Sequence, residues 1–225
     1  MFYIITELYS NTEGFVMAEL KNIIEERRSA NNFIKGIKVP KQDFIDIFEM
    51  LKLAPSCFNI QHANYLVITD EEKKEALREA AFNQYKVHTA SAAIIVLGDK
   101  EAYKKADKIY SGMLNLRMIS QFDYDKMLDD INSMYEGRGQ LFQRDEAIRN
   151  ASLSAMMFML IAKDKGWDTC PMIGFDSEKV KELFNIPENL EPVMLITMGK
   201  EDTSKRRFRG YRKPVGEFVV FEEFK

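Results

Sequence analysis

The sequence predicts an α+β fold, because three short apolar runs of strand character are separated by longer segments with helical periodicity. The three runs cover residues 65–68, 92–97 and 192–198. Few short strands with long helices between them predict a small sheet flanked by helices. The chain has 225 residues and shows no internal repeat, low-complexity run or clear linker, so we expect one domain over residues 17–225.

The composition is that of an ordinary globular protein. Of all residues, 46% are hydrophobic and 30% are charged, which excludes a disordered chain. The formal net charge of −3 excludes a protein that binds nucleic acid by neutralising it over a broad surface, but it allows a local basic patch. The two histidines, His62 and His88, are too few for a histidine-rich zinc centre, and we expect no metal site.

The cysteines and the apolar segments bear on the compartment. Cys57 and Cys170 could form one bridge at most, which excludes a disulfide framework and favours a reducing compartment. No apolar stretch reaches the ~18 residues that a membrane span needs. Residues 1–10 lack the basic start of a secretory signal. The cytoplasm is therefore the expected location, with no membrane partner.

The first elements of the chain are helical. A helix is expected over residues 18–28. Because it follows directly on Met17, residues 1–16 are expected to be an N-terminal extension or the result of an upstream start. A second helix opens after Pro40 and ends before Pro55, since the residue before a proline is pushed out of the helical region.

The middle of the chain alternates strands and helices. After the strand at 65–68, Asp70 is expected to cap a helix that runs to about Ala81, and the strand at 92–97 follows. Residues 100–144 have weak periodicity and are expected to form helical pieces and loops that leave the core.

The last third holds the clearest helix. Residues 145–165 are expected to be helical and to end at Gly166. The middle of this helix is apolar nearly all round, so it must be buried in the domain centre or against a second subunit. Another helix is expected after Asp176, followed by the strand at 192–198, and residues 218–221 could add an edge strand.

Searches for common catalytic motifs are negative. The chain has no GxxxxGK[ST] phosphate loop and no GxSxG nucleophile elbow. The stretch Gly137-Arg138-Gly139 lacks the third glycine of a dinucleotide fingerprint and does not follow a strand. Neither histidine has a partner in the sequence that suggests a catalytic triad.

Two basic clusters remain as candidates for chemistry. One is Arg27-Arg28-Ser29 at the end of the first helix, and the other covers residues 205–213. Arginines with a hydroxyl neighbour suit a phosphate monoester, which prefers planar bidentate donors. Alternatively, each cluster is a solvated surface, or Phe208 and Tyr211 turn the second into a stripe for single-stranded nucleic acid. The clusters alone leave these alternatives open.

Five short motifs occur in a fixed order over about residues 20–220, nearly the whole chain. They are Arg-Arg-Ser at 27–29, Ala-Pro-Ser-x-x-Asn-x-Gln at 54–61, Asn-Gln at 83–84, Pro-Met-x-Gly-Phe-Asp at 171–176 and Gly-Tyr-Arg-Lys-Pro at 210–214. In these motifs the chain resembles the nitroreductase family of FMN-dependent oxidoreductases. The resemblance implies a small, mostly antiparallel sheet flanked by helices, in an intertwined homodimer with shared active sites.

The resemblance also implies an activity. It predicts an NAD(P)H oxidoreductase that uses FMN, takes its electrons from NADH or NADPH, and passes them on by ping-pong hydride transfer through flavin N5. Nitroaromatics, quinones or similar small electrophiles would be the acceptors, and no side chain would act as a catalytic group. The alternatives are a protein that holds FMN without turnover, or a nucleic-acid-binding protein that uses residues 205–213. If the protein is the predicted enzyme, we expect no nucleic-acid partner.

The implied site residues fall into groups by the part of FMN that they would contact. Arg27, Arg28 and Ser29 would hold the phosphate and ribityl chain, with Arg209 and Arg212 approaching from the tail, and Asn31 stands where family members often carry a basic residue. The other implied cofactor-binding residues are Pro55, Ser56, Cys57 and Asn59 from the neighbouring subunit, the amides of Asn83 and Gln84, and Pro171, Met172, Ile173 and Gly174.

One of these groups carries a physical reason beside the resemblance. The backbone N–H groups of Ile173 and Gly174 would face flavin N5 and O4, and a missing Cβ lets backbone approach a flat ring closely. Phe122, Tyr124 and Tyr135 could overhang the flavin and shape the substrate slot, although ordinary packing would also explain them.

Overall fold

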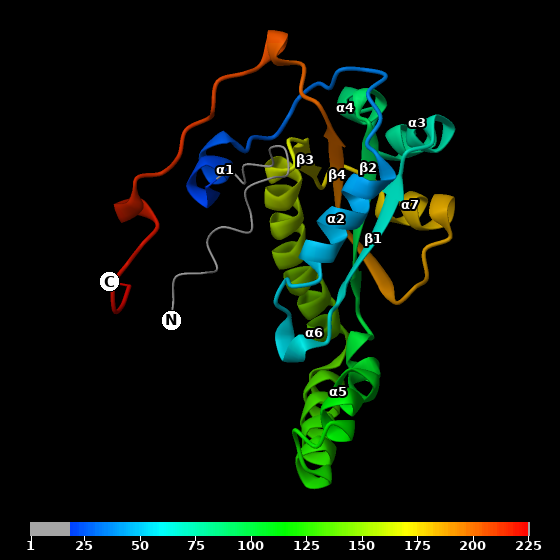
Figure 1. Cartoon of the computed structure of the whole chain (residues 1–225), viewed down its shortest axis with the longest axis vertical. Helices are drawn as coiled ribbons and strands as arrows, with labels where there is room; N and C mark the ends of the chain where they lie inside the picture. The colour runs from blue at the N-terminus through cyan, green and yellow to red at the C-terminus, as the bar shows by residue number, and fades with distance from the viewer. Residues whose placement is uncertain (1–18, 225) are drawn as a thin grey trace, which may run out of the picture.

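The computed structural model describes residues 19–224 and builds them around one four-stranded sheet (Figure 1). The strands are β1 (Ala63–Ile68), β2 (Ala92–Asp99), β3 (Asp168–Met172) and β4 (Leu190–Gly199). Their order is β1-β2-β4-β3, and all three neighbouring pairs are antiparallel. The predicted small antiparallel sheet is confirmed. The predicted extension over residues 1–16 lies outside the described residues, and the single domain over residues 17–225 stays a prediction.

The strands follow from their side-chain patterns. All eight residues of the central strand β2 are buried, which explains its nearly continuous apolar run. The edge strand β3 was not predicted, because its sequence is short and contains Pro171. A proline is tolerated at an edge, where one side of the strand needs no ladder partner.

Helices cover both faces of the sheet. One face carries α2 (Lys41–Leu51) and the second half of α6 (Gln121–Asp164), and the other carries α3 (Glu71–Ala80), α4 (Tyr85–Thr89) and α7 (Ser177–Phe184). Alternate residues of β2 point to the two cores, with Ile94 and Val96 on the α6 side and Ile95 on the α3 side. The remaining elements are α1 (Leu20–Glu26), α5 (Ala106–Asn115) and the 3₁₀ turns η1 (Cys57–Asn59), η2 (Ala102–Lys105), η3 (Thr203–Lys205) and η4 (Val215–Glu217).

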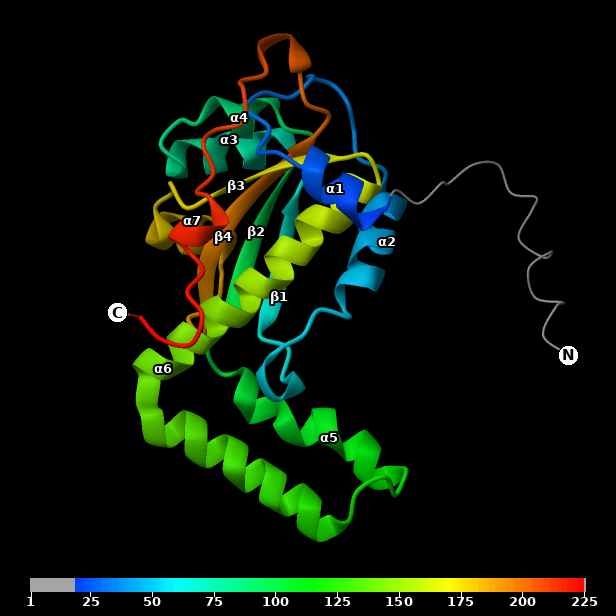
Figure 2. The ribbon, with the colours of Figure 1, turned by 90° about the vertical axis from the view of Figure 1, so that its left-hand side faces the viewer.

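Helix α6 is much longer than the predicted 145–165 and has two limbs. The bend lies at Gly139, whose φ of +74° is a left-handed conformation that glycine adopts at little cost. The first limb packs with α5 and stands away from the sheet, as Figure 2 shows. We call α5 with residues 121–138 the protrusion. The expected excursion from the core is confirmed, although it is helical almost throughout.

Most predicted helix ends are confirmed. The Asp70 side chain accepts a hydrogen bond from Lys73 N at 2.9 Å and caps α3, and Asp176 caps α7 in the same way. Pro40 directly precedes α2. The short helix α4 was not predicted.

The carboxy-terminal tail contradicts one expectation. Residues 218–221 form no strand, and the tail from residue 206 onward is largely exposed. It passes the end of α1 at Arg207 and Arg209, and Figure 2 shows that its last part then runs away from α1. Helix α6 is also not covered on all sides within one chain, because the Leu153 side chain is 50% exposed and that of Met156 is 42% exposed. None of the helices within residues 19–224 is long and apolar enough to cross a bilayer.

Candidate functional site

The two basic clusters, about 180 residues apart in sequence, meet at one cleft. This basic cleft has a volume of about 220 Å³ and lies between the end of α1 and the tail. It brings together Arg27, Arg28, Ser29, Asn31, Arg209 and Arg212 of the predicted cofactor-binding residues. It is also lined by Arg207, Phe208 and Gly210, which the prediction did not include although they belong to the same basic segment.

Backbone contacts hold the cleft in place. After α1 ends, Ala30 N donates to Thr169 O at 3.0 Å, which ties the Arg27-Arg28-Ser29 segment to the edge strand β3. The tail is attached through its arginines, because Arg209 donates to Glu25 O and, at 3.3 Å, to Arg27 O. Carbonyl groups at the end of a helix lack partners within the helix, so a cation stabilises them.

The positive charge of the cleft is not balanced by the protein. Within residues 19–224, no carboxylate lies within 4 Å of the guanidinium groups of Arg27, Arg28, Arg209 and Arg212. Burial lowers the pKa of Arg27, and the nearby charges of Arg209 and Arg212 lower it further. Arg206, in contrast, is paired with Glu201. A group with two negative charges would therefore fit this cleft.

The predicted glycine turn, residues 173–176, follows the other end of β3. The Gln84 Nε2 donates to Gly174 O at 2.7 Å, and Asp176 N donates to Ala80 O at 2.8 Å. A Cβ at Gly174 would lie 3.0 Å from Gln84 Nε2, so a larger residue here would push this amide aside by a few tenths of an ångström. The amide group of Gln84 was expected to face the cofactor. In the structure it holds the glycine turn in place through this hydrogen bond.

Strand β3 connects the cleft with the glycine turn. Thr169 accepts the hydrogen bond from the cleft segment, and Gly174 lies five residues further on, at most about 16 Å away at the strand rise of ~3.3 Å per residue. Gly174 does not line the basic cleft, so the cleft and the glycine turn lie at opposite ends of strand β3. Between them the Lys86 Nζ lies 3.4 Å from the Sγ of the buried Cys170, which adds a cation along this edge.

The turn over residues 55–61 lies elsewhere in the chain. Figure 1 shows it at the foot of the second limb of α6, away from α1 and the tail. It contains the predicted Pro55, Ser56, Cys57 and Asn59, and none of them lines the basic cleft. The expectation placed this turn at the cofactor of a second subunit, and a single chain does not bring the two together.

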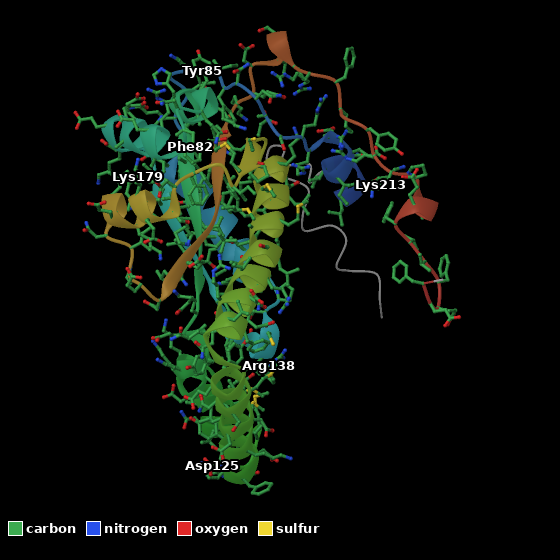
Figure 3. The ribbon with its side chains drawn as sticks, turned by 180° about the vertical axis from the view of Figure 1, so that it is seen from behind. Phe82, Tyr85, Asp125, Arg138, Lys179 and Lys213 are labelled. Atoms are coloured by element: carbon green, nitrogen blue, oxygen red, sulfur yellow. The ribbon has the colours of Figure 1, made fainter. Side chains whose placement is uncertain are left out.

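The remaining predicted residues occupy three different places. Asn83 is exposed, with a left-handed φ of +58°, beside Gln84. Met172 is buried in β3, and Pro171 is half-buried there. Phe122 is exposed on the protrusion, where the hydroxyl of Tyr124 donates to Asp107 O at 3.3 Å. Tyr135 is fully buried there and stacks on Tyr103, so it is a packing residue. Asp125, labelled in Figure 3, marks the far tip of the protrusion, so Phe122 and Tyr124 do not face the basic cleft of their own chain.

Known proteins match this chain over most of its length. The model of the family described as the nitroreductase family matches residues 24–200. Bacillus subtilis MhqN, which carries the name of an NAD(P)H nitroreductase, is 56% identical over 205 residues, covering 91% of this chain and all of that protein.

Solved structures give the same result. The nitroreductase ydfN of Bacillus subtilis superposes with a TM-score of 0.89 at 55% identity, covering 91% of this chain and 99% of that one. A nitroreductase of Exiguobacterium sibiricum, solved in complex with FMN, has a TM-score of 0.82 at 31% identity and covers 91% and 98% of the two chains.

Proposed function

Since the chain belongs to the nitroreductase family, we propose that it is an FMN-dependent NAD(P)H oxidoreductase that reduces small electrophiles. Nitroaromatics, quinones and similar molecules are the proposed acceptors. We further propose ping-pong kinetics, in which the nicotinamide and the acceptor occupy one place in turn. The same protein would accept NADH or NADPH as its reductant.

The observation that carries this proposal is the uncompensated basic cleft. The arginines that line it have no carboxylate partner among the described residues, and burial and mutual repulsion lower the pKa of Arg27. The phosphate of FMN would neutralise them through bidentate charge-assisted hydrogen bonds, with the Ser29 hydroxyl as a further partner. Asn31, Asn83 and Lys86 would contact the rest of the cofactor along the β3 edge.

The bound flavin would supply the hydride chemistry, and the protein residues bind and orient. Gly174 leaves room for a flat ring, and Gln84 fixes the backbone of the glycine turn so that its N–H groups keep one direction. Ile173 contributes only backbone to this task, because its side chain points into solvent in the single chain. We assign no side chain as a catalytic acid or base.

We also propose a homodimer with shared sites. The 55–61 turn is remote from the basic cleft of its own chain, and a second chain could supply it. Helix α1 and the second limb of α6 lie on the side of the molecule that faces the viewer in Figure 2. They carry exposed apolar side chains, such as those of Ile24 and Met156, which that chain would cover. The two free cysteines are consistent with the proposed cytoplasmic location.

The arrangement of the tail argues against the nucleic-acid alternative. Arg206 is neutralised by Glu201, and Arg209 is turned inward onto carbonyl groups of the α1 end. These side chains therefore do not form an open basic stripe with the exposed Phe208. The other alternative is a protein that binds FMN without turnover, and an experiment has to distinguish it from the proposed enzyme.

The test is the colour of the purified protein and its response to reductant. We expect a yellow protein with flavin absorbance that bleaches under anaerobic conditions on addition of NADH or NADPH. A colourless protein that takes up no FMN would contradict the proposal. Bound FMN that neither nucleotide bleaches would favour the binding protein.

A further inference from the structure

The 55–61 turn has a backbone that its sequence does not favour. Phe58, Asn59 and Gln61 have φ values of +48°, +49° and +54°, all in the left-handed region. Asparagine tolerates this region, whereas a phenylalanine there is uncommon and costs conformational energy. Residues held in such conformations cluster at functional sites, where the surrounding structure enforces them.

The side chain of Phe58 is also only partly buried. It is 39% exposed, and no ring contact with another aromatic side chain is present within residues 19–224. Its neighbour Ile60, in contrast, is buried in the cluster at the base of the protrusion. At Phe58 the backbone conformation is unfavourable for the residue type, and a large apolar side chain is left partly exposed to water. Conflicts of this kind between sequence and structure are typical of functional positions.

Two other elements hold the turn in this conformation. The hydroxyl of Tyr110, on α5, donates to Phe58 O at 2.5 Å. The Oδ1 of the buried Asn150, on the second limb of α6, accepts from Cys57 N at 2.7 Å, while its Nδ2 is oriented by the Glu146 carbonyl at 2.8 Å. The backbone is therefore held from outside the turn at two points, the N–H of Cys57 and the carbonyl of Phe58.

We propose that Phe58 is a specificity-determining residue for flat aromatic acceptors, and that Tyr110 and Asn150 are positioning residues that hold its ring in place. This rests on the proposed function, which places the 55–61 turn at the flavin of the partner subunit. An exposed ring fixed beside such a site offers an aromatic acceptor a second face for stacking. An acceptor without an aromatic ring gains nothing from it.

The test compares two classes of acceptor on the intact holoprotein. Phe58→Asn removes the ring and keeps a residue that tolerates the left-handed backbone. We expect kcat/KM for nitrobenzene and for 1,4-naphthoquinone to fall about two- to tenfold, as for the loss of one aromatic contact. The rate with ferricyanide, the FMN content and the melting temperature should not fall.

Tyr110→Phe tests the positioning role. It removes only the hydroxyl that holds Phe58 O and should give the same selective loss for the aromatic acceptors. Ser111→Ala is the matched control, because it deletes a hydroxyl that donates to Lys108 O on the same helix without contacting the turn. The double variant Phe58→Asn/Tyr110→Phe should lose no more than either single variant, since both remove one interaction.

The outcomes separate the inference from the proposed function. A parent protein without FMN or without ferricyanide reduction would contradict the proposed function itself. If the parent is active, the inference is overturned when Phe58→Asn keeps its efficiency with aromatic acceptors, when it loses both acceptor classes equally, or when it loses FMN. A Tyr110→Phe variant that is less stable but keeps the parent's acceptor preference would make Tyr110 merely structural.

Discussion

At the scale of single residues, Arg27 is the most informative position in the basic cleft. Its guanidinium is half-buried, its pKa is lowered by burial and by two neighbouring arginines, and it has no carboxylate partner among residues 19–224. We expect Arg27→Ala to weaken FMN binding by about 1.5–3 kcal/mol, the value of a lost charge-assisted bond, or roughly ten- to hundredfold in Kd. Fluorescence titration of the apoprotein with FMN measures it.

Arg144→Ala is the control for Arg27, because it removes an arginine that pairs with Glu191 far from the cleft. It should leave the Kd for FMN unchanged. Melting temperatures of both variants should stay close to that of the parent, since neither residue is in the core. Equal FMN affinity in Arg27→Ala and the parent would refute the phosphate assignment.

His62 makes a second prediction, on stability and pH. Its ring is buried, its Nε2 lies 3.1 Å from the Tyr135 hydroxyl, and Nδ1 has no hydrogen-bond partner. Burial lowers the pKa of His62 from 6.5 to about 4, and the charge of Asp99 offsets only part of this. Between these two pH values the unfolded chain takes up a proton that the folded protein refuses. Stability is therefore kept above about pH 6.5 and lost as the pH falls toward 4.

The size of this effect follows from the pKa difference. At ~1.4 kcal/mol per pH unit, His62 should lower the free energy of unfolding by roughly 2 kcal/mol between pH 7 and pH 5. Urea titrations of the parent and of His62→Gln at both pH values isolate the contribution of this residue, because all other groups titrate in both proteins. The same loss in the two proteins would mean that His62 is protonated in the folded state.

The sequence predicted six of the residues that line the basic cleft, but not the environment of His62. Arginine and serine side chains are suited to binding phosphate wherever they lie in a sequence, and the two clusters do lie together in the structure. The sequence indicated no partner for His62, whereas the residue is buried against Tyr135, 73 residues further along the chain. A pKa depends on what surrounds a group in space, and a contact over that distance leaves no local signal.

At the scale of elements, the contact between β2 and α6 gives the next prediction. A Cβ at Gly98 would lie 2.7 Å from Ala147 O and 2.8 Å from Ala147 C, which are backbone atoms of α6. Because backbone cannot move aside without shifting the helix, we expect Gly98→Ala to lower the free energy of unfolding by about 1–3 kcal/mol or more. Urea denaturation measures this change.

Gly112→Ala is the matched control for Gly98→Ala. Gly112 lies within helix α5, and a Cβ there would meet no atom within 4 Å. Alanine has the higher helix propensity, so this variant should be more stable than the parent by about 0.5–1 kcal/mol. Destabilisation of the same size in both variants would argue against the close approach of β2 and α6.

The elements that the sequence missed have physical reasons. Strand β3 carries Pro171, which argues against a central strand, and only its edge position makes it tolerable. The first limb of α6 has mostly polar, exposed residues, with Ile131 and Tyr135 among the few that are buried. Its helical period was therefore weak. The expected strand at 218–221 did not form, since β propensity needs a partner edge that the tail does not meet in its own chain.

At the scale of the whole molecule, the residues assigned to one active site lie in two separate regions of the folded chain. The basic cleft lies between α1 and the tail, whose Lys213 stands away from the sheet in Figure 3. The 55–61 turn lies near the base of the protrusion, where Arg138 is labelled. A symmetric dimer would complete each site with the turn of the other chain, because an isologous contact repeats every pairing twice.

This arrangement predicts complementation between two damaged chains. A homodimer of Arg27→Ala has two damaged clefts, and a homodimer of Ser56→Ala/Asn59→Ala has two damaged turns. In the mixed dimer one site combines both defects, while the other combines an intact cleft with an intact turn. Random mixing makes half of the dimers mixed, so about a quarter of all sites should regain the activity of the parent.

The measurement is NADH- or NADPH-dependent acceptor reduction after the two chains are co-expressed with different tags and the mixed dimer is isolated. Sedimentation must show twice the mass of the chain in each preparation. The isolated mixed dimer should then have about half of the activity of the parent, since one of its two sites is intact. Activity no higher than the mean of the two homodimers would mean that each chain builds its site from its own residues, and the assignment of the 55–61 turn to the partner would be wrong.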